Sequence, residues 1–319
     1  GKYMTLDKIL REIKKAEKIA IVTHAGPDGD AIGCSLAIGY GLKSLGKNPD
    51  ILIPEHSKSF NFMPGINDLK KESDVEKYDL AISLDCADSK ILKGYEEYFK
   101  KAKMKIVIDH HGSNTMYGDI NYINPVAPAC CQILIGMFKY FDIKITKNIA
   151  TCLMTGIITD TCGFCFNATS ETFEFAASVV RLGVDVSEIF RYTLQTKNKA
   201  NFELHKKAYD RMEFLEGGKV AFTYITLEDE IEVGAKPGDH EGIVEVGKNI
   251  ENVEVSIFLH PVGDKGYKIS LRSLEYVNVA NIALSLGGGG HNKAAGAFVT
   301  GTPEQIKQRA LREVRKQLK

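Results

Sequence analysis

Hydrophobic and polar positions follow two different periods along the first half of the chain. Apolar runs at Ile19–Thr23, Leu80–Leu84 and Ile106–Ile108 have the length of buried strands, whereas Ala31–Leu45 and Lys147–Ile158 show the spacing of helices. The further elements expected here are helices around Leu6–Ile13, Cys131–Phe141, Glu171–Leu182 and Val186–Leu194, and a strand at Ile51–Ile53. Strands that alternate with helices predict an α/β fold, in which a parallel sheet has helices on both faces.

The second half begins after a polar stretch at Gln195–Arg211 and a turn at residues 216–218. Strand-like segments follow at Val220–Ile225, Val253–Leu259 and Tyr267–Leu271, and helices are expected at Val277–Leu286 and from Pro303 onward. This pattern predicts a second, smaller α/β domain. The expected boundaries are 1–194 for the first domain, 195–216 for a connector and 217–319 for the second domain.

Composition limits the class of protein. The 319 residues suit two domains, and a content of 44% hydrophobic and 26% charged residues is ordinary for a soluble protein. No apolar run approaches the roughly 18 residues of a membrane span, and no apolar signal region is seen, so we expect a cytoplasmic protein with no membrane partner. The formal net charge of zero favours small anionic substrates over long duplex DNA, which usually requires a basic face.

Seven cysteines are scattered through apolar stretches, which indicates reduced thiols rather than disulfides. The spacing of Cys162 and Cys165 is compatible with a redox pair or with half of a zinc site, but no second pair at such spacing completes one. We therefore expect these two residues to be buried and inert, like the adjacent Cys130 and Cys131.

Acidic and histidine side chains follow three of the predicted strands at their carboxyl ends. They are His24, Asp28 and Asp30 after the first strand, Asp85 and Asp88 after the second, and Asp109, His110 and His111 after the third. Asp160, after the helical run Leu153–Thr159, is a fourth contributor. Because ligands bind outside the carboxyl ends of parallel strands, we expect these loops to meet in one crevice.

Such a group of carboxylates would repel itself without a cation, and two divalent cations would remove that cost. Mixed oxygen and nitrogen ligands suit Mn²⁺, with Mg²⁺, Co²⁺ or Fe²⁺ as alternatives. Cysteine does not dominate this set of residues, which argues against a structural, cysteine-rich zinc site. A single Asp or His of this kind is usually a loop cap or a surface charge. It is the joint pattern at three strand ends that favours a metal centre.

These residues resemble the motifs of the DHH phosphoesterase family. The matching segments are His24-Ala-Gly-Pro-Asp28-Gly-Asp30, Asp85-Cys-Ala-Asp88, the triplet Asp109-His110-His111, and Thr155-Gly-Ile-Ile-Thr-Asp160. In the second half, Ser270-Leu-Arg272-Ser273 and the run Gly287–His291, followed by Ala294-Ala-Gly296, resemble the DHHA1 domain. A chain of this length with only these two domains is similar to the nanoRNase/pAp-phosphatase branch.

The resemblance implies a parallel-sheet DHH domain, a smaller α/β DHHA1 domain and an active-site cleft between them. It implies that His24, Asp28 and Asp85 hold one cation, and that Asp30, Asp85, His110 and Asp160 hold the other, so that Asp85 bridges both. Among the catalytic residues, His111 would face the substrate phosphate and Asp109 would orient a ligand, while Asp88 would cap a loop. Two departures, Cys162 in place of a glycine and Cys130-Cys131 in place of hydroxyl residues, affect the pocket shape rather than the ligands.

In the second domain, four consecutive glycines would let backbone N–H groups approach an anion, although a glycine run alone is usually a flexible turn. Arg272 falls on the polar face of its strand, and its planar guanidinium group suits a phosphate. Together with the resemblance, this favours a substrate-binding set consisting of Arg272, Gly289, Gly290 and His291. Lys293 and Asn281 are weaker candidates, because residues of these types are usually solvated.

The expected activity is two-metal hydrolysis of short RNA oligonucleotides to 5′-mononucleotides, of pAp to AMP and phosphate, or of both. The partners would be short single-stranded RNA or small nucleotides, and the sequence leaves a homodimer open. A cyclic-dinucleotide phosphodiesterase acting on c-di-AMP or pApA is a rival that the identifiable residues do not exclude. A non-catalytic nucleotide sensor is a second rival, against which the complete ligand set argues.

Overall fold

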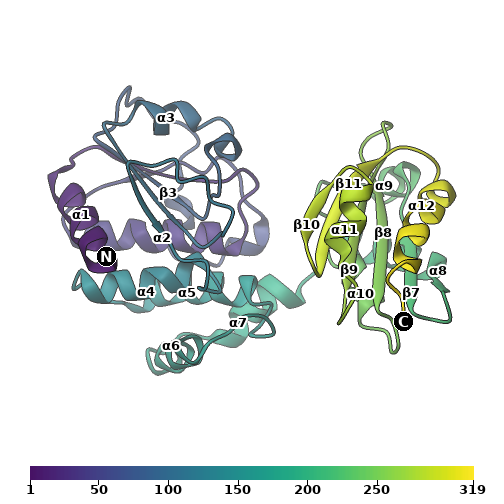
Figure 1. Cartoon of the computed structure of the whole chain (residues 1–319). Helices are drawn as coiled ribbons and strands as arrows, with labels where there is room; N and C mark the ends of the chain where they lie inside the picture. Colours follow the sequence, from purple (N-terminus) through teal and green to yellow (C-terminus); the bar gives the residue numbers. More distant parts are fainter. The chain divides into compact units, whose positions relative to one another are not determined.

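The computed structural model describes residues 1–319, which form two compact units, Gly1–Thr196 and Lys197–Lys319 (Figure 1). In the first unit, five parallel strands form a sheet in the order β2-β1-β3-β4-β5. Their bounds are β1 Ile19–Thr23, β2 Asp50–Ile51, β3 Leu80–Leu84, β4 Met104–Asp109 and β5 Ile120–Ile123. Strands β1 and β3 are buried along their whole length, as is usual where both faces of a parallel sheet are covered.

Helices cover both faces of this sheet, which confirms the predicted architecture. The helices are α1 Lys2–Lys15, α2 Gly29–Ser44, α3 Glu96–Lys101, α4 Cys130–Tyr140, α5 Lys147–Asp160, α6 Ser170–Arg181 and α7 Val186–Phe190. Figure 1 shows α2 on one side of β3 and α3 on the other. Alternate residues of β1 point to opposite faces of the sheet. Ile19 and Ile21 pack in the core with α2, α4 and α5, whereas Ala20 and Val22 pack on the other face with Phe99 of α3.

Two helices beneath the sheet approach each other closely because small residues lie between them. A Cβ atom at Gly33 of α2 would lie 2.5 Å from the carbonyl oxygen of Cys152 in α5. A Cβ atom at Gly156 of α5 would lie 2.8 Å from Oδ1 of Asp30 and closer still to Sγ of Cys131. The glycines therefore permit the contact that brings the start of α2 and the end of α5 together.

The second unit is a mixed sheet of six strands in the order β10-β11-β9-β8-β7-β6, in which only β7 and β8 are parallel. Its strands are β6 Glu213–Leu215, β7 Val220–Tyr224, β8 Val255–Pro261, β9 Tyr267–Ser273, β10 Gly289–His291 and β11 Ala294–Val299. Its helices are α8 Lys199–Arg211, α9 Leu227–Val233, α10 Ile243–Lys248, α11 Val279–Ser285 and α12 Pro303–Arg315. The main core lies between one sheet face and α11 and α12, and a smaller core lies on the opposite face with α8 and α10.

The structure departs from the sequence-based expectations at several elements. The helix expected at Val186–Leu194 is divided into α7 and a π-helical turn, η4, at Arg191–Gln195. The hydrophobic periodicity also did not predict three short 3-10 turns, η1 Lys58–Phe60, η2 Ile66–Asp68 and η3 Ser89–Leu92. The run of glycines is not a free loop, because its last part forms β10 at the sheet edge. Helix α8, within the expected connector, belongs to the second compact unit.

Candidate metal centre

The predicted acidic and histidine residues meet at the carboxyl ends of β1, β3 and β4. His24 and Asp85 directly follow β1 and β3, and His110 directly follows β4. Asp28 is the N-cap of α2 and accepts a hydrogen bond from the backbone N–H of Ala31. The remaining acids lie on helices, with Asp30 in the first turn of α2 and Asp160 at the last position of α5. The side chains that the strand pattern predicted to converge therefore lie together within the first unit.

Two groups of possible ligands share one carboxylate. His24 Nε2 lies 3.7 Å from Asp85 Oδ2 and 3.8 Å from Asp28 Oδ1. His110 Nε2 lies 3.2 Å from Asp160 Oδ2, 3.3 Å from Asp85 Oδ1 and 3.6 Å from Asp30 Oδ2. In His24, Asp28 and Asp85, and likewise in Asp30, His110 and Asp160, the possible ligand atoms all lie within 4.8 Å of one another. Asp85 belongs to the first set, and its Oδ1 atom also lies close to His110 of the second set, whereas its role as a bridging ligand stays a prediction.

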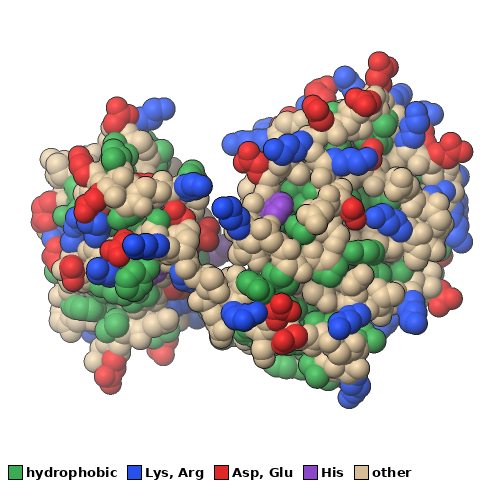
Figure 2. Space-filling view, turned by 180° about the vertical axis from the view of Figure 1, so that it is seen from behind, with side chains coloured by type: hydrophobic (Ala, Val, Ile, Leu, Met, Phe, Trp, Pro, Cys, Tyr) green, Lys and Arg blue, Asp and Glu red, His purple; other side chains and the backbone are tan.

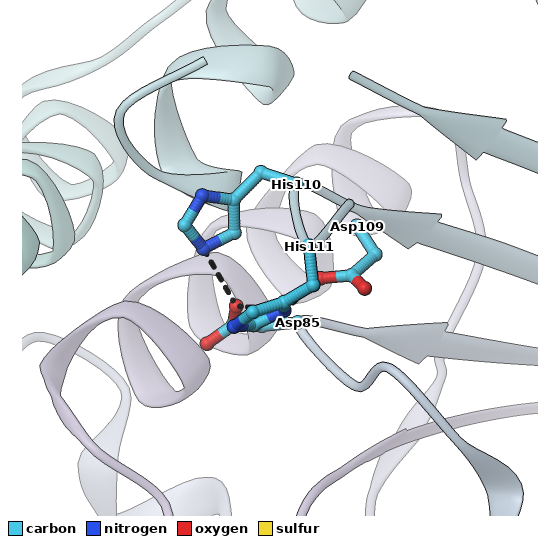
Figure 3. A group of neighbouring side chains, drawn as sticks. All are labelled: Asp85, Asp109, His110 and His111. Atoms are coloured by element: carbon cyan, nitrogen blue, oxygen red, sulfur yellow. Dashed lines mark hydrogen bonds and ion pairs between the residues drawn. The ribbon is translucent and has the colours of Figure 1, made fainter. Parts of the chain in front are cut away.

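The backbone at Asp85 is strained. This residue has a φ of 54°, in the left-handed region, which costs a residue other than glycine about 1–3 kcal/mol. Its side chain is almost fully buried, and its Oδ1 atom accepts no hydrogen bond. Figure 3 shows the imidazole of His110 directed at this carboxylate. A buried oxygen without a hydrogen bond is costly and needs a compensating partner, which a bound cation would supply.

Asp30 is held by the start of α4. The backbone N–H groups of Cys130 and Cys131 donate to its Oδ2 and Oδ1 atoms at 2.8 and 2.9 Å. A helix N-terminus carries free N–H groups and a positive partial charge, so it orients this carboxylate without any help from side chains. Cysteines can therefore stand where the resemblance leads us to expect hydroxyl residues, because the contact uses the backbone. Sequence reasoning missed this role.

Asp109 orients a histidine, although the contact is with His111. Its Oδ1 atom lies 2.7 Å from His111 Nδ1, and its Oδ2 atom accepts a hydrogen bond of 2.8 Å from Asn114 Nδ2. Asn114 also donates to the carbonyl oxygen of Cys86, so the carboxylate is fixed from both sides. The hydrogen bond with Asp109 raises the pKa of His111 above its ordinary value, which favours the ring with both nitrogens protonated, and in that form Nε2 is a donor. Asn114 was not predicted as a functional residue, because its only signal in the sequence is a position three residues after the triplet.

The pKa shifts in the cluster indicate an excess of negative charge, which protons or other cations would compensate. Burial and the nearby charge of Asp85 raise the pKa of Asp30 well above its ordinary value. The carboxylates of Asp28 and Asp85 raise the pKa of His24 to about 11. Burial alone would lower the pKa of His110, yet Asp160 and Asp85 raise it to about 12. Protons would thus fill the cluster in the absence of other cations, and the donor set fits two divalent cations in their place.

The expected substrate-binding residues lie on β9 and on the edge strand β10 of the second unit, with β11 between these two strands. Arg272 of β9 donates from Nε to Glu245 Oε1 at 2.8 Å, so its guanidinium group is already paired. Gly289, Gly290 and His291 form the exposed edge strand β10. A Cβ atom at Gly290, where φ is 147°, would lie 2.6 Å from Cα of Ala295. Asn281 and Lys293 are exposed, and neither side chain makes a contact that favours a binding role.

The expectation about the cysteines is half correct. Cys130 and Cys131 are buried as expected, but Cys162 and Cys165 are exposed. The error has a local cause, since Cys162, Gly163 and Phe164 all have positive φ angles and form a left-handed turn just after α5. Such a turn at the surface cannot be read from apolar neighbours in the sequence. Asp88 behaves as expected, because it is the N-cap of η3 and accepts a hydrogen bond from the N–H of Lys90.

Residues 18–157 match the DHH family, N-terminal domain, and residues 217–319 match the DHHA1 domain. The chain is also 34% identical to the bifunctional oligoribonuclease and PAP phosphatase NrnA of Thermus thermophilus, over 99% of this chain and 96% of that protein. The chain belongs to the DHH/DHHA1 family. The resemblance drawn from the sequence motifs is thereby confirmed.

The chain is also similar to one solved structure over its full length and to part of a longer protein. The solved structure of an exopolyphosphatase-related protein from Bacteroides fragilis has a TM-score of 0.87 at 27% identity, and the match covers 98% of this chain and 96% of that one. The cyclic-di-AMP phosphodiesterase GdpP of Geobacillus thermodenitrificans is 26% identical over 95% of this chain, but the match covers only 48% of that protein. This chain thus matches nearly the whole of the first two relatives and about half of the third.

Proposed function

We propose that this DHH/DHHA1 protein is a metal-dependent phosphoesterase that hydrolyses short RNA oligonucleotides to 5′-mononucleotides and pAp to AMP and phosphate. The observation that carries the proposal is the pair of ligand groups that share Asp85 at the ends of three parallel strands. The full-length similarity to an oligoribonuclease and PAP phosphatase supports the choice of substrates.

The chain's own residues would divide the work as follows. His24, Asp28 and Asp85 would hold one cation, and Asp30, Asp85, His110 and Asp160 the other. When bound, such cations supply a polarised water at near-neutral pH and neutralise charge on the phosphoryl oxygens. His111 would contact the substrate phosphate or the leaving oxygen through Nε2, while Asp109 and Asn114 keep its ring oriented.

We propose Mn²⁺ as the preferred metal, because the donors are oxygen and imidazole nitrogen with no thiolate among them. Mg²⁺, Co²⁺ and Fe²⁺ remain the alternatives for the same donor set. In the second domain, Arg272 with Gly289, Gly290 and His291 would bind the nucleotide, and Arg272 would share its guanidinium group between Glu245 and a phosphate.

Small substrates are supported by the surface as well. On the face shown in Figure 2, lysines and arginines alternate with acidic side chains, and no continuous basic band is visible. No helix of the chain combines the length and the apolar character needed to cross a bilayer. We place the enzyme in the cytoplasm, because all seven cysteines are free thiols.

The cyclic-dinucleotide alternative is less favoured, since the relatives with that activity match over only about half of their length. The sensor alternative is disfavoured by the complete set of ligand side chains at the strand ends.

A substrate panel tests the proposal. The purified full-length protein, loaded in turn with Mn²⁺, Mg²⁺, Co²⁺ or Fe²⁺, would be given pAp, short RNAs, pApA and c-di-AMP. We expect the highest kcat/KM on pAp or short RNA with Mn²⁺. A clear preference for c-di-AMP would replace the proposed substrates, and no turnover with any cation would favour the sensor.

A further inference from the structure

A polar strip runs along β9 on the face of the second-domain sheet that carries Arg272. Lys268, Ser270 and Arg272 are exposed or half-buried, whereas Ile269 and Leu271 between them are fully buried in the core. In a strand, alternate residues share a face, so the three polar side chains stand in one row. Lys268 and Arg272 are four residues apart, which is about 13 Å along a strand.

The neighbouring strand β11 leaves most of this row uncovered. Ala294 lies opposite Arg272 in the register, and Gly296 lies opposite Ser270. Both are small, so no side chain rises from this strand between the two basic residues. Only at the far end does a large residue appear, where Phe298 pairs with Lys268 and is 50% exposed.

A stack of aromatic rings stands at the Lys268 end of the strip. His260 of β8 is the register partner of Lys268 and therefore shares its face. The ring of His240 lies on that of His260, with centroids 3.8 Å apart and planes inclined by 19°. The ring of Phe258, two residues before His260, lies 6.0 Å from it in a stacked arrangement.

The two histidines are not explained by packing alone. Nδ1 of His260 is buried and has no hydrogen-bond partner, and such a buried polar atom needs an explanation. Burial and the charge of Lys268 lower the pKa of His240, and burial, His240 and Lys268 lower the pKa of His260 to about 4. At neutral pH both rings are therefore uncharged. Uncharged aromatic rings beside a lysine make a platform for a nucleobase and its phosphate.

We propose that His240, stacked on His260 beside Lys268, is a second nucleotide subsite that takes a base of an RNA substrate beyond the nucleotide bound at Arg272. The base would stack on His240, and Lys268 would contact an adjacent phosphate. This inference rests on the proposed function. A stacked strand advances about 3.4 Å per nucleotide and an extended strand more, so the 13 Å between the two basic residues spans roughly two to four nucleotides. The subsite is therefore reached by trimers and longer RNAs but not by pAp or pApA.

The test compares His240→Ala and Lys268→Ala with wild type on pAp, pApA, a trimer and a pentamer of RNA. We expect kcat/KM on the trimer and pentamer to fall roughly 5- to 50-fold, as for the loss of one stacked base, with no change on pAp and pApA. His240→Phe keeps a ring and should retain most of the activity on the pentamer. Lys265→Ala, an exposed lysine in the β8–β9 turn, is the charge-matched control and should behave as wild type.

The possible outcomes separate the subsite from the proposed function. If the variants and wild type show the same length profile, the subsite is wrong while the phosphoesterase stands. Equal losses on pAp and the pentamer would mean that His240 supports the fold rather than an RNA base. If wild type cleaves nothing, the proposed function fails, and fluorescence anisotropy with a labelled pentamer decides the subsite, since equal affinity in wild type and His240→Ala would overturn it.

Discussion

In the first domain, the proposed functional side chains come from three strand ends and two helices and are mostly buried, whereas in the second domain they lie on β9 and on the edge strand β10, with β11 between these two strands. Asp30 and Asp85 are almost fully inaccessible, but the whole of β10 is exposed. The candidate metal-binding cluster is fixed by backbone N–H groups at Asp30, by the strained φ of Asp85 and by closely packed helices. The proposed nucleotide-binding residues have fewer such constraints, apart from the ion pair of Arg272 with Glu245.

Function and stability conflict in the buried cluster of the first domain but not at the exposed sheet edge of the second. Gathering carboxylates in a buried crevice destabilises the metal-free fold, because each charge loses solvation and repels its neighbours. The exposed edge carries no such penalty. We therefore expect changes in the cluster to alter metal binding, stability and turnover together, and changes at the sheet edge to alter substrate affinity alone.

The largest effect is expected from Asp85→Asn. Asparagine tolerates the left-handed φ of 54°, so the backbone should persist while the bridging charge is lost. We expect kcat to fall by roughly 10³–10⁴-fold, as for removal of a catalytic group, and calorimetry to show weaker Mn²⁺ binding. Near-normal turnover would exclude Asp85 as the bridging ligand.

The contrast between the two regions also explains how far the sequence could be read. The runs Ile19–Thr23 and Leu80–Leu84 are strands with those same bounds, and the polar residues after them converge as predicted because parallel strands end at one sheet edge. The hydrogen bonds from the start of α4 to Asp30 could not be predicted from the sequence, because they come from backbone N–H groups, which nearly any residue supplies. Strand β10 was missed because glycines carry no strand signal, and its pairing with β11 depends on tertiary contacts.

A smaller but broader effect is expected from Gly156→Ala, which tests whether close helix packing holds the cluster together. The new methyl group would lie 2.8 Å from Asp30 Oδ1, so α5 must shift away from α2. We expect a loss of about 1–3 kcal/mol in the free energy of unfolding, with weaker metal binding. Gly136→Ala in α4 is the matched control, because a Cβ atom there meets nothing within 4 Å, and it should stabilise the helix by about 0.5–1 kcal/mol. Equal effects of both substitutions would contradict the packing argument.

Arg272→Ala addresses the second domain by itself. Loss of a charge-assisted contact to phosphate should reduce kcat/KM on pAp by roughly 10- to 100-fold. Metal binding should not change, since every proposed ligand lies in the first domain. A small ester such as bis-p-nitrophenyl phosphate has no nucleotide to anchor, so its hydrolysis should fall much less. Equal losses on both substrates would show that Arg272 serves the fold or the chemistry rather than nucleotide binding.

The smallest effect is expected from replacing both exposed cysteines by serine. Cys162 and Cys165 lie in the turn region just after the proposed ligand Asp160, and they are the two exposed thiols of the chain. Neither belongs to a group of side chains that could hold a metal ion, and serine is nearly the same size. We therefore expect the double variant to keep its metal content, its unfolding midpoint and most of its turnover of pAp. The measurement is metal analysis together with steady-state kinetics under reducing and oxidising conditions.

If oxidation lowers the activity of wild type and not of the variant, the pair of cysteines regulates the site, and our expectation of inert thiols is wrong. If bound zinc is lost in the variant, the two cysteines form a metal site, and our expectation of inert thiols is likewise wrong.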